Sequence, residues 1–151
     1  MQLLGSDPIA LADNARRGVQ LGAPGVDLNF GCPAKTVNRH GGGSSLLRTP
    51  VDVEKIVSAV RDAVPSSIPV TAKIRLGFDH TDFLLDIVTR IERAGATELC
   101  VHARTRDDGY KPPAYWNKVQ AVRESVSLPV IINGEIWNLD NADQALSLIH
   151  I

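Results

Sequence analysis

The chain has 151 residues, of which 44% are hydrophobic and 22% are charged, and its formal net charge at pH 7 is −1. This composition argues against an intrinsically disordered chain, and the two cysteines, Cys32 and Cys100, are too few for a disulfide framework. Because no apolar run has membrane-spanning length and no signal-peptide pattern opens the chain, we expect a cytoplasmic protein without a membrane partner.

Helix and strand patterns alternate along the whole chain. Asp7 followed by Pro8 is typical of a helix start, and Thr49 followed by Pro50 repeats this pattern. Apolar spacing predicts helices after both starts, and again over 84–95, over 116–126 and from 139 to the chain end. Short apolar runs predict strands over 26–30, 70–76, 98–103 and 129–133, with residues 1–5 as the tail of a further strand. In the last helix, the residues expected to face inward are Leu139, Ala142, Ala145, Leu146 and Ile149.

A polar residue stands at the end of each of the four longer predicted strands, namely Asn29, Lys73, His102 and Asn133. Their spacing of about 30 residues suits a repeated βα unit, apart from a first gap that is lengthened by a Gly-rich loop. Polar residues gathered at one rim of parallel strands are typical of the active face of a TIM (β/α)8 barrel. We therefore favour an α/β fold of this type over a flavodoxin-like open sheet, which needs no such residue at every strand end.

The predicted strands are fewer than a closed barrel requires. The sequence holds about five βα units, whereas the barrel closes with eight strands in roughly 250 residues. We therefore expect the chain to be an incomplete part of a larger barrel. Open strand edges would then favour self-association.

The segment Asn29-Phe30-Gly31-Cys32-Pro33 places a thiol directly after a predicted strand. A structural cysteine is expected inside an apolar run rather than beyond it, so Cys32 is a candidate acid or nucleophile, and a packing role is the alternative. The loop that follows contains Gly41-Gly42-Gly43. We interpret it as a mobile loop rather than a phosphate site, because it lacks the lysine of a P-loop.

Lys73 and Arg75 lie two residues apart in a predicted strand, so their side chains point to the same side. Two cations inside a barrel need an anionic partner, which predicts a bound anionic cofactor or substrate; cations that reach solvent are the alternative. We interpret His102 as a member of the same site rather than as a packing residue. Asn133-Gly134 suits a simple turn and a close approach to a ligand equally well.

Other kinds of site are disfavoured. No pair of carboxylates is placed for the acid–base catalysis of a glycosidase. The four histidines and two cysteines lack the spacing of metal ligands, so we predict no metal site. Tyr110 follows Asp108-Gly109 and is expected on an exposed loop.

Five segments of the chain, in order, resemble the tRNA-dihydrouridine synthases, which are flavin enzymes with a TIM-barrel fold. The most specific segment is Asn29-Phe30-Gly31-Cys32-Pro33. Its continuation through Arg39 to Gly43 is most similar to the bacterial C type, which implies the uridine at position 16 of the tRNA D-loop as the target. The other matching segments are Gln2-Leu3-Leu4-Gly5, Lys73-Ile74-Arg75-Leu76-Gly77, Val101-His102-Ala103-Arg104-Thr105 and Asn133-Gly134-Glu135-Ile136.

The resemblance implies FMN as the cofactor and NADPH as its reductant, acting on the C5–C6 bond of a uracil. It implies that Cys32 is the general acid that protonates C5 when hydride reaches C6. The implied substrate contacts are Asn29, Arg75 and Tyr110. The implied FMN contacts are Gln2, Lys73, His102, Asn133, Gly134 and Glu135.

The family pattern is only partly present. The first barrel strand, the last strands with the FMN-phosphate segment and the C-terminal tRNA-binding helical domain have no counterpart in this sequence. Residues 1–151 are therefore expected to form a partial FMN-binding catalytic domain that, alone, binds tRNA poorly and turns over no substrate. Two alternatives stay open: a dihydroorotate dehydrogenase-like flavin barrel, and a non-catalytic RNA-binding or assembly module.

Overall fold

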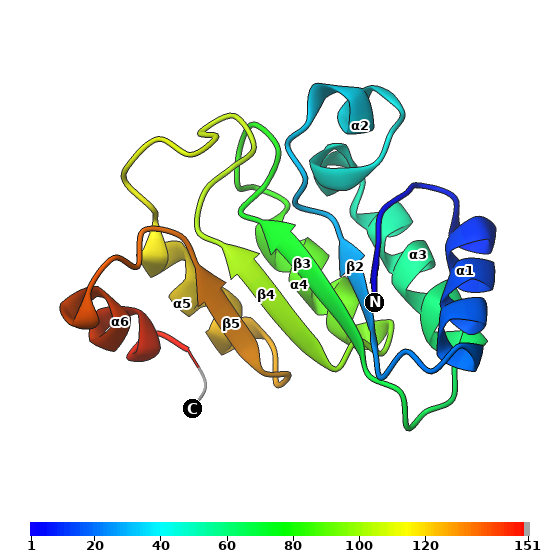
Figure 1. Ribbon diagram of the computed structural model, residues 1–151. Helices are drawn as coiled ribbons and strands as arrows, with labels where there is room; N and C mark the ends of the chain where they lie inside the picture. The colour runs from blue at the N-terminus through cyan, green and yellow to red at the C-terminus, as the bar shows by residue number, and fades with distance from the viewer. Residues whose placement is uncertain (150–151) are drawn as a thin grey trace.

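A five-stranded parallel sheet forms the centre of the computed structural model, which describes residues 1–149. The strands are β1 (Gln2–Leu3), β2 (Val26–Asn29), β3 (Val70–Arg75), β4 (Glu98–His102) and β5 (Val130–Asn133). The helices are α1 (Pro8–Gln20), α2 (Lys35–Arg39), α3 (Pro50–Ala63), α4 (Leu84–Arg93), α5 (Trp116–Ser125) and α6 (Leu139–Leu146), with a 3-10 helix, η1 (Gly43–Arg48), before α3 (Figure 1). None of these helices is both long enough and apolar enough to cross a membrane.

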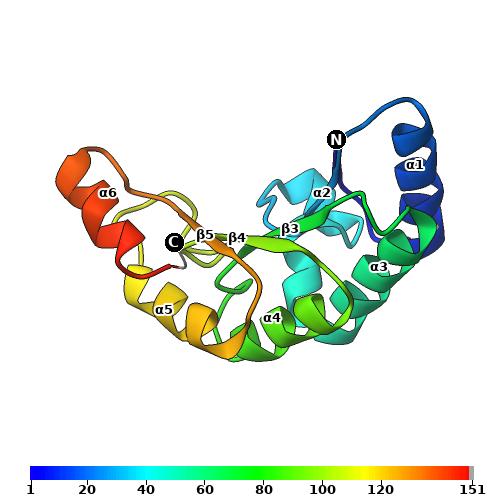
Figure 2. The same cartoon turned by 90° about the horizontal axis from the view of Figure 1, so that it is seen from below.

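The strand order distinguishes a TIM barrel from a flavodoxin-like open sheet, the two folds that we considered from the sequence. Every strand pairs in parallel with its neighbours in the chain, whereas a flavodoxin-like sheet reverses its order at a switch point. The sheet is curved, with α1, α3, α4 and α5 along its convex side and its concave side open (Figure 2). Consecutive βα units curved in this way form part of a TIM (β/α)8 barrel, so the predicted fold is confirmed.

Aliphatic side chains fill the space between the sheet and the helices. Alternation along β3 turns Val70, Ala72 and Ile74 toward the helices, and each of them is at most 1% exposed. Helix α3 meets them with a stripe that includes the fully buried Val53 and Ile56. Burial of each valine or isoleucine side chain contributes about 1.5–3 kcal/mol, so this apolar layer holds the sheet and the helices together.

The two predicted helix starts differ in how they are capped. The side chain of Asp7 accepts hydrogen bonds from the backbone N–H groups of Ile9 (2.9 Å) and Ala10 (3.2 Å), as its cap position predicts. Thr49 forms no such cap, because its hydroxyl donates to the carbonyl of Leu46 (3.3 Å). The 3-10 turn that directly precedes α3 brings this carbonyl within reach of Thr49.

Helix α6 departs from its prediction. It ends at Leu146, and residues 150–151, which the predicted helix included, lie outside the described residues. The inward orientation is confirmed for Ala145, which is 1% exposed, but it is wrong for Leu139 and Leu146, which are 82% and 45% exposed. Helix α6 follows the last described strand, so within residues 1–149 no next βα unit packs against its outer side.

Candidate active site

The concave face of the sheet carries polar side chains in rows. The regular register places Asn29 of β2 beside Lys73 of β3. One row further along, Arg75, His102 and Asn133 lie side by side on β3, β4 and β5. Because parallel strands end at the same rim, these rows gather amide, ammonium, guanidinium and imidazole groups at one place.

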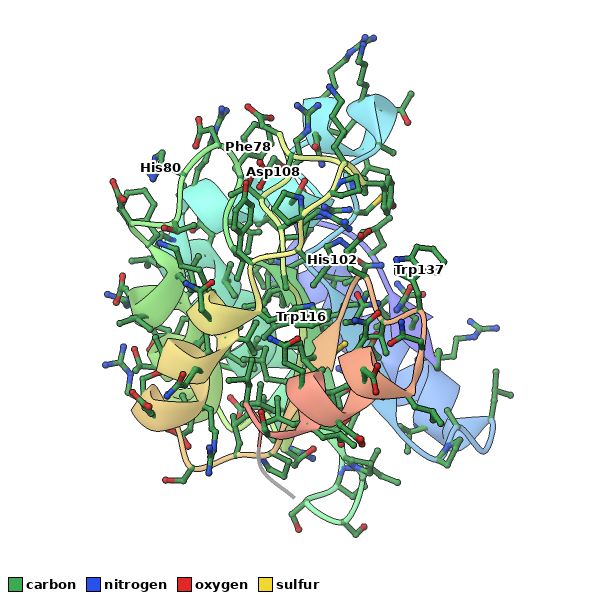
Figure 3. The ribbon with its side chains drawn as sticks, turned by 90° about the vertical axis from the view of Figure 1, so that its left-hand side faces the viewer. Phe78, His80, His102, Asp108, Trp116 and Trp137 are labelled. Carbon is green, nitrogen blue, oxygen red and sulfur yellow. The ribbon has the colours of Figure 1, made fainter. Side chains whose placement is uncertain are left out.

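A cleft of about 380 Å³ opens at this rim, at the carboxyl ends of β2 to β5. In Figure 3, His102 lies toward the end of the molecule where the labelled loop residues Phe78 and Asp108 stand. The cleft brings together the predicted acid, the predicted substrate contacts and part of the predicted FMN contacts. Its lining residues are Asn29, Gly31, Cys32, Pro33, Lys73, Ile74, Arg75, His102, Tyr110 and Asn133.

Cys32 stands in the turn that ends β2. The Asn29 side-chain oxygen accepts the backbone N–H of Gly31 (2.9 Å), which turns the chain away from the sheet directly before the thiol. The carbonyl of Cys32 accepts hydrogen bonds from the Asn38 amide (3.0 Å) and the Ser44 hydroxyl (2.9 Å). The half-buried Cys32 thus lines the cleft, and these hydrogen bonds fix the backbone that carries its thiol.

The Gly-rich segment after Cys32, which we predicted as a mobile loop, is largely helical, and Gly41 and Gly43 in it have positive φ. It forms α2 and η1, and Gly42, Gly43 and Ser44 are buried. Gly43 has a φ of +60°, and a Cβ at this position would lie 2.7 Å from the carbonyl oxygen of Cys32. The glycine is therefore needed so that this segment can pack against the backbone of Cys32.

A chain of hydrogen bonds orients the amide of Asn29. The Asp27 carboxylate accepts from the Thr71 hydroxyl (2.7 Å) and from the Gln2 amide nitrogen (2.6 Å). The Gln2 amide oxygen in turn accepts from the amide nitrogen of Asn29 (3.1 Å). Gln2 does not line the cleft itself, but it fixes which way the Asn29 amide faces, because a carboxylate can only accept.

Lys73 points into the cleft from the middle of the sheet. Its ammonium donates to the side-chain oxygen of Asn133 (3.1 Å) and lies 3.5 Å from the sulfur of Cys100. Burial raises the pKa of the Cys100 thiol, so the sulfur is uncharged at neutral pH. Both hydrogen-bond partners of Lys73 are therefore neutral, and its ammonium can attract an anionic group of a ligand.

Arg75 donates hydrogen bonds to backbone carbonyls, which we did not predict from the sequence. It is 3% exposed, and it donates to the carbonyls of Gly31 (2.9 Å), Thr105 (3.0 Å) and Gly109 (2.9 Å). Burial lowers the pKa of its guanidinium. The expectation that it requires an anionic partner was wrong, because backbone carbonyls satisfy it and tie the loops after β2 and β4 together. Its contact with substrate, with the ring of Tyr110 5.1 Å away, stays a prediction.

His102 is buried between polar neighbours. Its Nδ1 lies 2.7 Å from the side-chain oxygen of Asn133, and the ring of Tyr110 meets it edge-on at 5.9 Å between centroids. Burial lowers the pKa of His102, and the nearby charges of Arg75, Arg104 and Lys73 act in the same direction. The imidazole is therefore neutral at physiological pH.

Gly134 and Glu135 lie just outside the cleft lining. The indole N–H of Trp116 donates to the carbonyl of Gly134 (2.8 Å), and Glu135 has a φ of +61°. The Glu135 carboxylate forms an ion pair with the guanidinium of Arg104, and this hydrogen bond lowers the pKa of Glu135. Its side chain is thus engaged within the protein.

Two residues beside the site, Cys100 and Arg104, were not identified from the sequence. They stand two residues before and two residues after His102. The alternation that joined Lys73 to Arg75 could have found both of them. Within the described part of the chain, no group of three or more His, Cys, Asp or Glu side chains is arranged to hold a metal ion.

Known proteins are similar to this chain over nearly its whole length. The model of the family described as dihydrouridine synthase (Dus) matches residues 1–149. The tRNA-dihydrouridine(16) synthase of Shewanella oneidensis is 52% identical over 148 residues, which are 98% of this chain and 47% of the relative. The enzyme of that name from Pseudomonas syringae is 55% identical over 141 residues, which are 93% of this chain and 44% of the relative. The chain thus spans about half the length of these curated relatives.

Solved structures share the fold at low sequence identity. The N-acetylneuraminate lyase of Mycoplasma synoviae has a TM-score of 0.64 at 12% identity, and the match covers 92% of this chain and 44% of the lyase. The phosphoenolpyruvate phosphomutase of Streptomyces platensis has a TM-score of 0.61 at 18% identity, covering 95% of this chain and 60% of the mutase. At these identities the likeness concerns the fold alone.

Proposed function

The chain belongs to the dihydrouridine synthase family, and we propose that the protein reduces the C5–C6 double bond of a uracil in tRNA to form dihydrouridine. The observation that carries this proposal is the convergence of Cys32, Lys73 and His102 on one cleft at the carboxyl ends of the strands. The relatives bear the name tRNA-dihydrouridine(16) synthase. We propose the same target here, the uridine at position 16 of the D-loop.

FMN, with NADPH as its reductant, is the cofactor that we propose; when bound, it supplies the hydride that reaches uracil C6. The cleft suits this group because the ammonium of Lys73 has only neutral partners. An ammonium there stabilises the negative charge that develops at the pyrimidine end of a flavin on reduction. Because the Glu135 carboxylate is paired with Arg104, we propose that Glu135 contributes its backbone. The full proposed set is Gln2, Lys73, His102, Asn133, Gly134 and Glu135.

We propose that Cys32 is the general acid. Its thiol lines the cleft, and it would hold a proton at Sγ and deliver it to C5 of the uracil. The Asn29 amide, oriented through Gln2, would bind the polar edge of the base. Tyr110 is 69% exposed beside the guanidinium of Arg75, so its ring is available to stack on a base that has left the RNA helix.

The curved sheet needs completion before it can enclose a nucleotide. Its five strands leave the concave side open, whereas a closed barrel has eight. We propose that further strands complete the cleft, from a longer form of this polypeptide or from a second copy at an open edge, and that tRNA binds to the completed protein. The family match disfavours the dihydroorotate dehydrogenase-like alternative; a non-catalytic module is an outcome of the test below.

The test uses a chimera in which this chain is part of a full-length relative. The matching half of the Shewanella oneidensis relative is replaced by this chain, and dihydrouridine at position 16 of unmodified tRNA is measured by mass spectrometry with NADPH present. We expect product from the chimera, and a rate about 10²- to 10⁴-fold lower for Cys32→Ala. The matched control is Ser66→Ala, which also removes one heteroatom but lies at the other end of the sheet.

Either of two results would refute the proposal. A chimera that folds and takes up FMN but forms no dihydrouridine would support a non-catalytic module. Equal rates for Cys32→Ala and Ser66→Ala would remove Cys32 from the role of acid. The visible absorption spectrum of the purified chain, with and without added FMN, is the first measurement, because an FMN band shows whether the five strands already bind the cofactor.

A further inference from the structure

Arg104, at the end of β4, is a buried cation to which the proposed function gives no role. It is 2% exposed, although guanidinium groups are rarely buried so completely. Its Nε donates to the carbonyl of Lys111 (2.8 Å) and lies 3.4 Å from that of Pro113. One terminal nitrogen pairs with the carboxylate of Glu135, and the other lies 3.4 Å from Nε2 of His102.

The neighbours of His102 leave it only one hydrogen-bonding state. The ammonium of Lys73 can only donate, so it is the oxygen of the Asn133 amide that faces Lys73. The same oxygen lies 2.7 Å from Nδ1 of His102, so Nδ1 must carry a proton. Nε2 faces Arg104, which also can only donate, so Nε2 must present its lone pair.

The three cations around His102 oppose a second proton on its ring. Lys73 and Arg75 face it from β3, and Arg104 from the end of β4; Tyr110 comes from the loop after β4. Glu135 is the acidic neighbour, and its carboxylate is neutralised by Arg104. A proton on Nε2 would point at a guanidinium, so the neutral ring is the stable form.

Arg104 also restrains the backbone at Glu135. A non-glycine residue in the left-handed region costs about 1–2 kcal/mol, and Glu135 has a φ of +61°. The ion pair with Arg104 holds the Glu135 side chain, and the bond from Trp116 to the carbonyl of Gly134 holds the backbone before it. One guanidinium therefore contacts two residues to which the family resemblance gives FMN contacts, His102 and Glu135.

We propose that Arg104 is a positioning residue of the cleft, which holds His102 as the neutral Nδ1–H tautomer and holds Glu135 in its left-handed conformation. The part that concerns flavin affinity rests on the proposed function, whereas the tautomer of His102 does not depend on it. His102 then carries no proton at Nε2, where its lone pair faces Arg104. A ligand in the cleft then meets the positive charge of Lys73 and not a charged imidazole.

The experiment measures the ring nitrogens of His102 by two-bond 1H–15N correlation NMR in the purified 151-residue chain across pH. In the native sequence we expect a protonated Nδ1 and an unprotonated Nε2. In Arg104→Met we expect the titration midpoint of His102 to move upward and a form protonated at Nε2 to gain population. The same variant should weaken binding of FMN, followed by absorbance, about tenfold, which corresponds to the loss of about one hydrogen bond.

Arg61→Met is the matched control. Arg61 is half-buried, whereas Arg104 is fully buried, and like Arg104 it donates to backbone carbonyls, those of Val64 (3.1 Å), Pro65 (2.5 Å) and Ile68 (2.7 Å), but at the opposite end of the sheet. Its removal should destabilise the fold to a similar extent. The spectrum of His102 and the affinity for FMN should stay as in the native sequence.

The possible outcomes separate this inference from the proposed function. A native His102 protonated at Nε2 overturns the inference, even if Arg104→Met does not fold. An Arg104→Met spectrum identical to the native one overturns it as well. A third outcome is that the native chain shows the expected tautomer and the variant changes it, while neither protein binds FMN. That outcome supports the positioning of His102 by Arg104 and contradicts flavin binding by the chain.

Discussion

The two faces of the sheet are built from the same strands but from opposite kinds of residue. Toward the helices, Val70, Ile74 and Leu99 are completely buried and apolar. On the concave side, Lys73 and Cys100 alternate with them, half-buried and polar or ionisable. Alternation along a strand thus lets one set of side chains stabilise the fold while its neighbours remain available for chemistry.

This difference has a consequence for mutations. A change on the convex face should alter the free energy of unfolding and leave the chemistry of the cleft intact. A change on the concave face should alter ligand binding with little effect on stability. The predictions that follow test this division, beginning with the largest expected effect.

Truncation of Leu99 should give the largest effect on stability. Leu99 is fully buried on the convex side of β4, so Leu99→Ala should lower the free energy of unfolding by about 2–5 kcal/mol through lost burial and a residual cavity. Urea unfolding followed by circular dichroism measures this loss. Leu85→Ala on α4 is the control, since Leu85 is 46% exposed, and its loss should be much smaller. Equal losses would contradict the assignment of the core.

Substitution of Gly43 should lower the free energy of unfolding and also move the thiol of Cys32. Gly43→Ala would place a Cβ 2.7 Å from the carbonyl oxygen of Cys32 in a left-handed backbone, which predicts a destabilisation of about 1–3 kcal/mol. The rate at which Cys32 is alkylated by iodoacetamide should change as well, because the backbone of Cys32 must shift. Both quantities are measurable in the purified chain.

Gly109→Ala separates backbone strain from collision. Gly109 has a φ of +62°, close to that of Gly43, but a Cβ there would meet nothing within 4 Å. We therefore expect only the strain of about 1–2 kcal/mol and an unchanged alkylation rate of Cys32. If both variants changed the alkylation equally, the packing of Gly43 against Cys32 would not be what holds the thiol.

Gly43 also marks the limit of what the sequence could predict. The strands and long helices follow from local patterns, so β3 was predicted to within one residue of its observed range. His102 was found because it is a polar residue that ends an apolar strand. The predicted position of Lys73 at a strand end was wrong, because Lys73 lies inside β3, two residues before Arg75. The burial of Gly43 depends on a contact with Cys32 eleven positions earlier, which no local pattern reports. The role of Arg104 likewise depends on partners from two later loops.

Removal of the Lys73 charge should affect ligand binding more than stability. The partners of Lys73 are a thiol and an amide, both neutral, so Lys73→Met should change the free energy of unfolding by less than about 1 kcal/mol. It should weaken binding of FMN about 10- to 100-fold, the cost of one charge-assisted hydrogen bond. Absorbance titration measures this affinity. Lys55→Met is the control, because Lys55 pairs with Asp52 on the helix side of the sheet, and it should bind FMN like the native chain.

Acidification should give the smallest effect, and it should occur in two separate ranges of pH. The pKa of His102 is lowered from its ordinary value of 6.5, chiefly by burial, so below that value the unfolded chain binds a proton that the folded chain does not. The stability due to neutral His102 is therefore fully present above pH 6.5 and is lost as the pH falls toward its folded pKa. Arg104 lowers the pKa of Glu135 from 4.5, so the contribution of Glu135 is present above that pH and is lost below it.

Variants assign a group at the cleft to each of the two pH ranges. Urea unfolding of the native chain across pH should show both losses. His102→Gln should lack the first loss, and Glu135→Gln should show a smaller second loss, because the lowered pKa values of Glu54 and Asp79 contribute to the same acidic range. His102 and Glu135 both lie on the cleft side of the sheet, whereas the buried side chains on the convex face are aliphatic. If the native chain and His102→Gln lost stability in parallel between about pH 7 and about pH 5, another group would be responsible. His102 would then not be held neutral by burial and by the cations around it.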